Sequence, residues 1–229
     1  MSMAHKKHKA HNNSSLRPVL IQSSIFTLEC ANNSVYILCS QDASKDLEHF
    51  RQGTGAPFCV ANTFTGRVFD IALCPDDVSC TAKSLAEAYR SRGVTVCSEL
   101  EMDEAELGAI AILRRAQVKV GMQTYVLELQ PVPGTDFPAR YVGKSQDLTK
   151  RWAQHWQGTA AKWTARHNPV RVLSVDLNRG DNYIESRSHE DEATLALMRE
   201  AMSEHGPDGW RTVRGGKWTK TEMGKLREL

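Results

Sequence analysis

Residues 140–156, RYVGKSQDLTKRWAQHW, determine the expected fold of the second half of the chain. Residues 140–142 have the composition of a β-strand. Residues 147–156 have the apolar spacing of an amphipathic helix. Within that helix Arg151 and His155 are four residues apart, so their side chains project from one face. The segment therefore predicts a strand that leads directly into a helix with two polar side chains on one face.

Elements on either side of this segment extend the prediction. Residues 124–129 alternate between apolar and polar side chains, as a half-buried strand does. Residues 131–134 include two prolines and a glycine, which predicts a hairpin with a long loop between the two strands. Either Ser145 or Asp147 would cap the helix, and Gly158 would end it.

Composition restricts the class of protein. The chain has 229 residues, of which 41% are hydrophobic and 24% are charged, as is ordinary for a globular protein. Its longest apolar stretches are far shorter than a membrane span, and no apolar segment follows the basic N-terminus, so we expect neither a membrane protein nor a secretory signal. Net charge is +2, and residues 117–229 hold 17 basic and 14 acidic side chains. This mild excess permits contacts with phosphates.

Cysteine and tryptophan are segregated along the chain. All six cysteines lie before residue 98, and all five tryptophans lie after residue 151. This break predicts two modules that join near residue 117. Residues 1–17 are polar and basic and predict a disordered tail, residues 18–116 a first module, and residues 117–229 a second domain. Because no Cys-x-x-Cys pair is present, we expect reduced thiols in a cytoplasmic protein.

The first module has alternating strand and helix patterns but no recognisable chemistry. Strands are predicted at residues 35–39, 68–74 and 94–96, and helices at residues 82–92 and 103–116. This order is typical of a small α/β module. Its role stays open, and assembly with a partner is one alternative.

An ordered set of motifs in the second domain resembles the GIY-YIG nuclease family. The resemblance runs from residue 125 to residue 216 and includes a strand at residues 170–175 followed by a long helix that contains Glu190. Two departures stand out: residues 123–125 keep only the tyrosine of Gly-Ile-Tyr, and the segment from Met198 to Val213 is longer than usual. The motifs are Tyr125, then Tyr141-Val142-Gly143, then Asp147-Leu148 with Arg151 and His155, residues 161–164 and 167–170, Glu190 with Thr194, Leu195 and Met198, and residues 213–216.

The resemblance implies both a fold and an activity. The fold would be α+β, with a small, mainly antiparallel central sheet flanked by helices and preceded by the small α/β module. The activity would be metal-dependent endonucleolytic hydrolysis of phosphodiester bonds in DNA. Glu190 would be catalytic and would ligate a single Mg²⁺ or Mn²⁺, and a hard cation held by one carboxylate and several waters is physically reasonable.

Further residues take roles from the same resemblance. Arg151 would clamp the scissile phosphate with two hydrogen bonds, a geometry that lysine does not offer. Tyr141, or Tyr125 hydrogen-bonded to it, would position and deprotonate the attacking water, for which a nearby cation must lower the usual tyrosine pKa of about 10. His155 would orient a tyrosine or share its proton. Substrate contacts would come from Gly143, Lys144 and Arg214.

Several alternatives stay open at this level. Glu192 or Glu185 would be the metal ligand if the helix had another phase. The domain could also be a catalytically silent DNA-binding module that kept the fold. A strand tyrosine is commonly a core ring, and Trp163 or Trp218 could stack on an exposed base. Sequence preference, pathway and oligomeric state are not fixed by the sequence.

Overall fold

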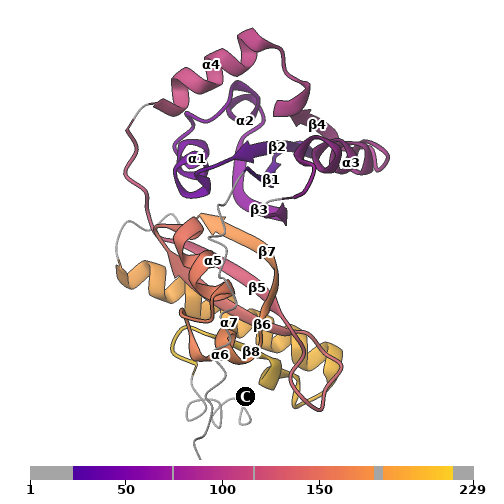
Figure 1. The fold of residues 1–229 in the computed structure, drawn as a ribbon, viewed down its shortest axis with the longest axis vertical. Coiled ribbons are helices and arrows are strands. Elements are labelled where there is room, and N and C mark those ends of the chain that lie inside the picture. The colour runs from indigo at the N-terminus through magenta and orange to yellow at the C-terminus, as the bar shows by residue number, and fades with distance from the viewer. Residues whose placement is uncertain (1–22, 74, 116, 178–182, 219–229) are drawn as a thin grey trace, which may run out of the picture.

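The computed structural model describes residues 23–73, 75–115, 117–177 and 183–218. The predicted tail at residues 1–17 lies outside these ranges. The described residues form one mixed sheet of eight strands in the order β4-β2-β1-β3-β7-β5-β6-β8, with helices packed around it (Figure 1). The first half (residues 23–115) supplies β1 to β4, and the second half (residues 117–218) supplies β5 to β8.

The elements of the first half agree with the predicted strands at residues 35–39 and 94–96 and with both predicted helices. The strand predicted at residues 68–74 is present but begins earlier and ends at Ala72, and residue 74 lies outside the described residues. The prediction missed the first strand and two helices. The elements are β1 (Ser24–Cys30), β2 (Ser34–Ser40), α1 (Ala43–Arg51), α2 (Pro57–Ala61), β3 (Phe64–Ala72), α3 (Val78–Arg90), β4 (Thr95–Ser98), a 3-10 turn (Glu99–Glu101) and α4 (Glu104–Arg115).

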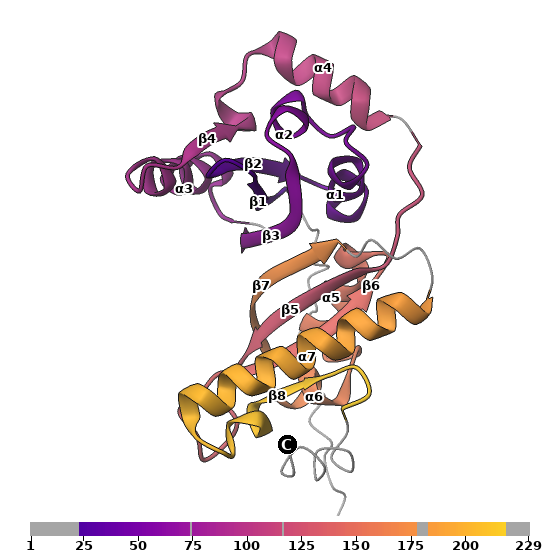
Figure 2. The ribbon, with the colours of Figure 1, turned by 180° about the vertical axis from the view of Figure 1, so that it is seen from behind.

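The second half contains the predicted hairpin, helix, strand and long helix. The elements are β5 (Gln123–Leu129), β6 (Ala139–Ser145), α5 (Leu148–Trp156), α6 (Lys162–Arg166), β7 (Pro169–Leu177), α7 (Tyr183–His205), a 3-10 turn (Gly209–Thr212) and β8 (Val213–Gly215). Helices α5 and α7 cover opposite faces of this part of the sheet, as comparison of Figures 1 and 2 shows.

The two halves have the same strand topology. In each, the first two strands form an antiparallel hairpin, β1 with β2 and β5 with β6. In each, the first strand also pairs antiparallel with the third, and the second pairs parallel with the fourth. The halves meet where the edge strands β3 and β7 pair antiparallel.

This edge pairing corrects one expectation and leaves another in place. The α+β class is confirmed. The sheet is mainly antiparallel, as expected, with parallel ladders only between β2 and β4 and between β6 and β8 among the described strands. It is, however, larger than the small sheet expected for the second domain, because β3 and β7 satisfy each other's exposed backbone groups, as unpaired sheet edges tend to do.

The main hydrophobic core also continues from one half into the other. Phe26 of β1 stacks on Trp152 of α5, with ring centroids 6.2 Å apart. Both side chains are buried, at 0% and 2% exposure. The segregation of tryptophans and cysteines along the chain therefore does not correspond to two separate cores.

Helix α5 begins as one of the two alternatives predicted. Asp147 is its N-cap and accepts a hydrogen bond from the Lys150 backbone N–H at 2.8 Å. Ser145 instead shapes the turn before it, because its hydroxyl accepts from the Asp147 N–H at 3.0 Å. Gly158 follows the helix with a φ of +72°, a conformation that favours glycine.

Two further findings concern expectations from composition. Within the ranges described, no helix is long and apolar enough to cross a membrane. Cysteines 30, 39, 59, 80 and 97 are free thiols, and Cys30 and Cys59 are buried. Cys74 lies outside the described residues.

Candidate active site

The residues named from the motifs gather at one end of the second half. Tyr125 and Tyr141 lie on adjacent strands β5 and β6, whose ladder sets Tyr125 opposite Gly143. Arg151 and His155 lie on α5, and Glu190 lies on α7. Strand β6, with β8 beyond it, lies at the outer edge of the sheet, and Figures 1 and 2 show α5 and α7 on opposite faces of the sheet.

A chain of buried hydrogen bonds runs behind this edge. The Tyr125 hydroxyl lies 2.7 Å from His155 Nε2, and His155 Nδ1 lies 2.8 Å from the Thr164 hydroxyl. Thr164 donates its only hydroxyl proton to the Ala161 carbonyl at 3.1 Å. We therefore assign the proton on His155 to Nδ1, which donates to Thr164, so that Nε2 accepts from Tyr125.

His155, in the middle of this series of hydrogen bonds, is neutral at neutral pH. Burial, and to a lesser extent the positive charge of Arg151, together lower the pKa of His155 to about 4. The side chain is fully buried. A neutral imidazole with a fixed tautomer is a hydrogen-bond acceptor for Tyr125 and fixes the orientation of that ring.

Arg151 lies against both tyrosines. Burial is the largest influence on the pKa of Tyr125 and of Tyr141 and raises both, whereas Arg151 lowers both through its charge and a hydrogen bond. One guanidinium nitrogen also donates to Gln154 Oε1 at 3.1 Å. The net pKa of each tyrosine remains above its usual value, so both hydroxyls are protonated at neutral pH in the protein alone.

Gly143 leaves space for the side chains of Tyr125 and Tyr141 because it has no Cβ atom. A Cβ atom at this position would lie 2.5 Å from the Tyr125 hydroxyl oxygen and 2.8 Å from Tyr141 Cε1. Both distances are far below van der Waals contact. The structure thus gives this glycine a steric role, in addition to the substrate contact that the motif predicts.

Glu190 lies across the site from Tyr141, with a side chain that is 13% exposed. Burial raises its pKa, and the Gly216 N–H and Lys144 counteract this. The Gly216 N–H donates to Oε1 at 3.1 Å, and the Lys144 ammonium lies 3.7 Å from Oε2. A largely buried carboxylate whose pKa is raised by burial is stabilised in its charged form by a cation that binds it.

The helix phase at Glu190 separates it from one alternative ligand. Glu192 is exposed and accepts a hydrogen bond from the Ser188 hydroxyl at 2.9 Å on the outer face of α7. The side chain of Glu185 lies outside the described part of the structure. Of the two glutamates described, Glu190 is therefore the one that faces the site.

A cleft of about 400 Å³ opens in front of Tyr141 and Glu190. Its rim is basic and aromatic. The Arg214 guanidinium lies over the Trp163 ring, 4.5 Å from the centroid, and burial lowers its pKa. The other residues lining the cleft are Lys162, Arg166, Gly215, Gly216 and Trp218.

The acidic groups fit only one kind of metal site. Among the residues described, no three His, Cys, Asp or Glu side chains converge as a metal cage would require. Asp191, beside Glu190, already accepts from the Lys217 N–H at 2.9 Å. The donor set therefore fits a hard cation held by the Glu190 carboxylate and waters, the arrangement that Mg²⁺ tolerates, and does not fit a protein-only cage.

Sequence reasoning missed some of these residues. Thr164, which fixes the tautomer of His155, lies inside the motif at residues 161–164 but was given no role. Lys162, within the same motif, and Arg166, two residues after it, add positive charge to the cleft. A pairing of each polar side chain in the motif with a possible partner would have singled out Thr164. Lys144 and Arg214, named as substrate contacts, do lie at the site.

Comparisons of the chain with family models, with curated proteins and with solved structures found no match. The family resemblance of residues 125–216 therefore rests on its motifs.

Proposed function

We propose that the second half is a metal-dependent DNA endonuclease domain of the GIY-YIG type. The observation that carries this proposal is the buried Tyr125–His155–Thr164 chain behind a cleft that contains Tyr141 and Glu190. A purely structural tyrosine pair would not need a neutral, fully buried histidine beside an arginine. Such an arrangement costs folding free energy, and strained or desolvated polar groups of this kind are concentrated at functional sites.

Each side chain has a role in hydrolysis of a phosphodiester. Arg151 binds the equatorial oxygens of the scissile phosphate and holds it in line with the attacking water. Tyr141 accepts a hydrogen bond from that water, and His155 keeps the neighbouring Tyr125 ring in place. Glu190 holds the Mg²⁺ or Mn²⁺, which when bound supplies positive charge at the phosphate.

The cleft rim supports a nucleic-acid substrate. Lys162, Arg166 and Arg214 provide positive charge for flanking phosphates. Trp218 lines the same cleft and offers a ring on which a displaced base could stack. Charge and aromatic surface together are typical of sites that bind DNA backbones.

Nicking of supercoiled plasmid tests the proposal. Wild-type protein should relax the plasmid with Mg²⁺ or Mn²⁺ and leave it intact with EDTA. Glu190→Gln should lower the nicking rate at least about 100-fold, because metal charge stabilisation is worth several kcal/mol. Glu192→Gln, on the outer face of the same helix, is the matched control and should nick at the wild-type rate.

Direct metal binding separates the nuclease from a silent DNA-binding module. Mn²⁺ titration followed by electron paramagnetic resonance should show one bound ion per chain in the wild type and none in Glu190→Gln. A gel shift with duplex DNA should show that both proteins bind. Binding of DNA without nicking, with or without metal, would instead favour the silent module.

A further inference from the structure

The two halves share a sequence pattern as well as a topology. Residues 40–54 are SQDASKDLEHFRQGT, and residues 145–159 are SQDLTKRWAQHWQGT. Seven of these fifteen aligned positions are identical, at a constant offset of 105 residues. The same offset relates the bounds of β2 to β6 and of β3 to β7 without any gap between them. The equivalent elements also match in length: seven residues for β1 and β5, nine for α1 and α5, and nine for β3 and β7.

Local geometry repeats with the sequence. Asp42 caps α1 by accepting from the N–H three residues on, as Asp147 does for α5. Gly53 and Gly158 end these helices with φ of +73° and +72°. The next residue of each half, Thr54 or Thr159, donates its hydroxyl to a carbonyl of the helix at 3.1 or 3.2 Å.

The ladder that joins the halves has the symmetry expected for two copies. Its three residue pairs are Arg67 with Asp176, Val68 with Val175, and Phe69 with Ser174. Phe69 and Ser174 are themselves 105 residues apart, so each pairs with its own equivalent. An approximate two-fold relation through that pair therefore exchanges the two halves.

Most active-site positions are replaced in the first half. Only one tyrosine of the site is kept. With the strand ladders and the 105-residue offset as the guide, Tyr141 corresponds to Tyr36, Tyr125 to Phe26, Arg151 to Asp46, His155 to Phe50 and Thr164 to Cys59.

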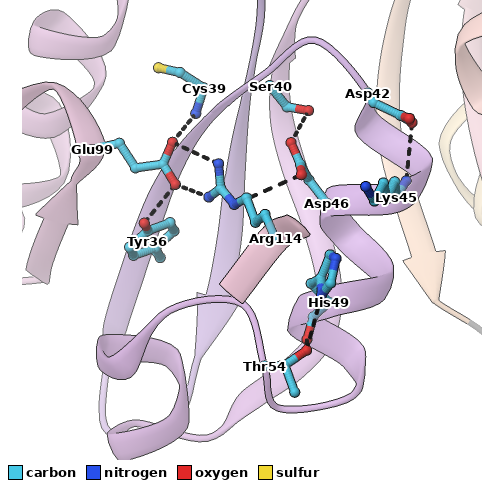
Figure 3. A network of polar contacts seen from close by, with 10 residues as sticks. All are labelled: Tyr36, Cys39, Ser40, Asp42, Lys45, Asp46, His49, Thr54, Glu99 and Arg114. Atoms are coloured by element: carbon cyan, nitrogen blue, oxygen red, sulfur yellow. Dashed lines mark hydrogen bonds and ion pairs between the residues drawn. The ribbon is translucent and has the colours of Figure 1, made fainter. Parts of the chain in front are cut away.

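Tyr36, the site tyrosine that the first half keeps, belongs to a closed network of charged and polar side chains, shown in Figure 3. Its hydroxyl donates to Glu99 Oε1 at 2.6 Å, and the Cys39 N–H donates to Oε2 of the same carboxylate at 3.1 Å. Arg114, from the connecting helix α4, binds Glu99 and lies 3.8 Å from Asp46. The tyrosine that lines an open cleft in the second half is thus bound here to Glu99, which is paired with an arginine whose side chain is only 17% exposed.

Charge in the first half also opposes a role in phosphate binding. Residues 18–116 hold eight Lys and Arg against thirteen Asp and Glu. Asp46 stands where the second half has its phosphate-binding Arg151, which reverses the charge at that point. A polyanion such as DNA would be repelled from this surface.

One hydrogen bond connects α1 of the first half to the start of α5 in the second half. The backbone N–H of Leu148, the first residue of α5, donates to the Ser44 hydroxyl of α1 at 2.7 Å in a buried setting. The Gln123 side chain donates to the Ser44 carbonyl at 3.1 Å, also buried. The first N–H groups of a helix lack partners within the helix, so an outside acceptor fixes where the helix begins. Helix α5 is the one that carries Arg151 and His155.

We propose that the two halves are copies of one folding unit, that the first is catalytically silent and closed by Arg114, and that it positions the active-site helix of the second through Ser44. Ser44 is a positioning residue, because it acts on Arg151 and His155 only through the start of α5. The catalytic silence of the first half is defined relative to the nuclease activity proposed above for the second half, on which this inference rests.

The first experiment compares equivalent tyrosines in the full-length protein. Tyr141→Phe should lose nicking, because it removes the hydroxyl that contacts the attacking water. Tyr36→Phe should nick at the wild-type rate when both are assayed well below the melting temperature of the less stable variant. An equal loss of nicking in the two variants would overturn the claim that the first half is silent.

The second experiment tests the positioning role of Ser44. Ser44→Ala should lower kcat about tenfold with KM changed less than about twofold, because a small displacement of the phosphate-binding arginine costs rate. Amide hydrogen exchange at Leu148 should be faster than in the wild type. Ser34→Ala is the matched control, a buried serine of the same half whose hydroxyl donates to the Ala31 carbonyl in the adjacent turn at 2.6 Å, and it should change neither quantity. Ser44→Thr keeps the hydroxyl and should restore most of kcat.

The outcomes distinguish the two proposals. If the wild type does not nick DNA, the proposed function fails, and exchange at Leu148 still decides whether Ser44 holds α5. If the wild type nicks and Ser44→Ala keeps the full kcat, the positioning role is wrong. Unchanged exchange at Leu148 in Ser44→Ala would also overturn it.

Discussion

Replacement of Arg114 by alanine should destabilise the protein more than loss of any surface ion pair. Arg114 is mostly buried, and its partner Glu99 has a side chain that is 6% exposed. Burial acts to lower the pKa of Arg114, but Glu99 and Asp46 raise it more, so the charged form is stabilised by these carboxylates. Without the guanidinium, Glu99 would remain buried as an uncompensated charge.

The magnitude follows from that burial. Breaking a buried ion pair by removal of one partner costs about 3–5 kcal/mol, whereas an exposed pair is worth about 0–1 kcal/mol. Arg90 and Glu101 form such an exposed pair in the same half, with side chains 44% and 36% exposed. Arg90→Ala is therefore the matched control for Arg114→Ala.

Urea denaturation followed by tryptophan fluorescence and circular dichroism measures both variants. Arg114→Ala should lower the free energy of unfolding by about 3–5 kcal/mol, and Arg90→Ala by no more than about 1 kcal/mol. The double variant Arg114→Met, Glu99→Gln should lose less than Arg114→Ala, because it buries no unpaired charge and keeps an acceptor for Tyr36. If Arg114→Ala loses no more than Arg90→Ala, or if the double variant loses as much as the single one, Arg114 does not close the first half through its charge.

Three further predictions concern the second half. Because the pKa of His155 is lowered to about 4 from an unfolded value near 6.5, the stability it contributes is present above pH 6.5 and is lost as pH falls toward 4. Unfolding free energies of wild type and His155→Gln across that window should differ in slope, by up to about 3 kcal/mol in total, and parallel curves would contradict the assignment. Gly143→Ala should destabilise the protein by about 1–3 kcal/mol and reduce nicking, since its Cβ would meet the Tyr125 hydroxyl, whereas Gly108→Ala, in open space on α4, should not destabilise it. Arg151→Lys should lower the nicking rate about 100-fold although it keeps the charge, and a wild-type rate would exclude a two-point phosphate contact.

The second half was predictable because its local signals agree with one another. Strand alternation at residues 124–129, the capped helix that starts at Leu148 and the strand before α7 are each set by local pattern, and the structure has all of them. The α+β class, which the family resemblance implies, agrees with these elements. The phase of α7 turns Glu190 inward and Glu192 outward. The resemblance predicts Glu190 as the ligand, but the sequence leaves Glu192 and Glu185 open because a charged run permits several helix phases.

The size of the sheet was not predictable from local pattern. Its centre is the ladder between β3 and β7, whose strands are about 100 residues apart in sequence. Nothing within either strand specifies that partner, since an edge strand offers the same backbone groups to any other edge. Long-range hydrogen bonds such as that from Leu148 to Ser44 are hidden from sequence reasoning for the same reason.

The role of the first half could not be predicted from its sequence for a different reason, and that reason bears on the role. Motif recognition depends on the side chains proposed to be catalytic, and Phe26, Asp46 and Phe50 stand at the equivalent positions of the first half. The residues that did persist between the halves, such as Asp42 and Gly53 with their equivalents Asp147 and Gly158, serve caps and turns and carry no chemistry of their own. If neither the structure nor the chemistry of the first half mattered, these cap and turn residues would be replaced as often as the other residues. Their retention beside the replaced site indicates that the shape of the first half matters while its chemistry does not, and a rigid support for α5 requires the shape alone.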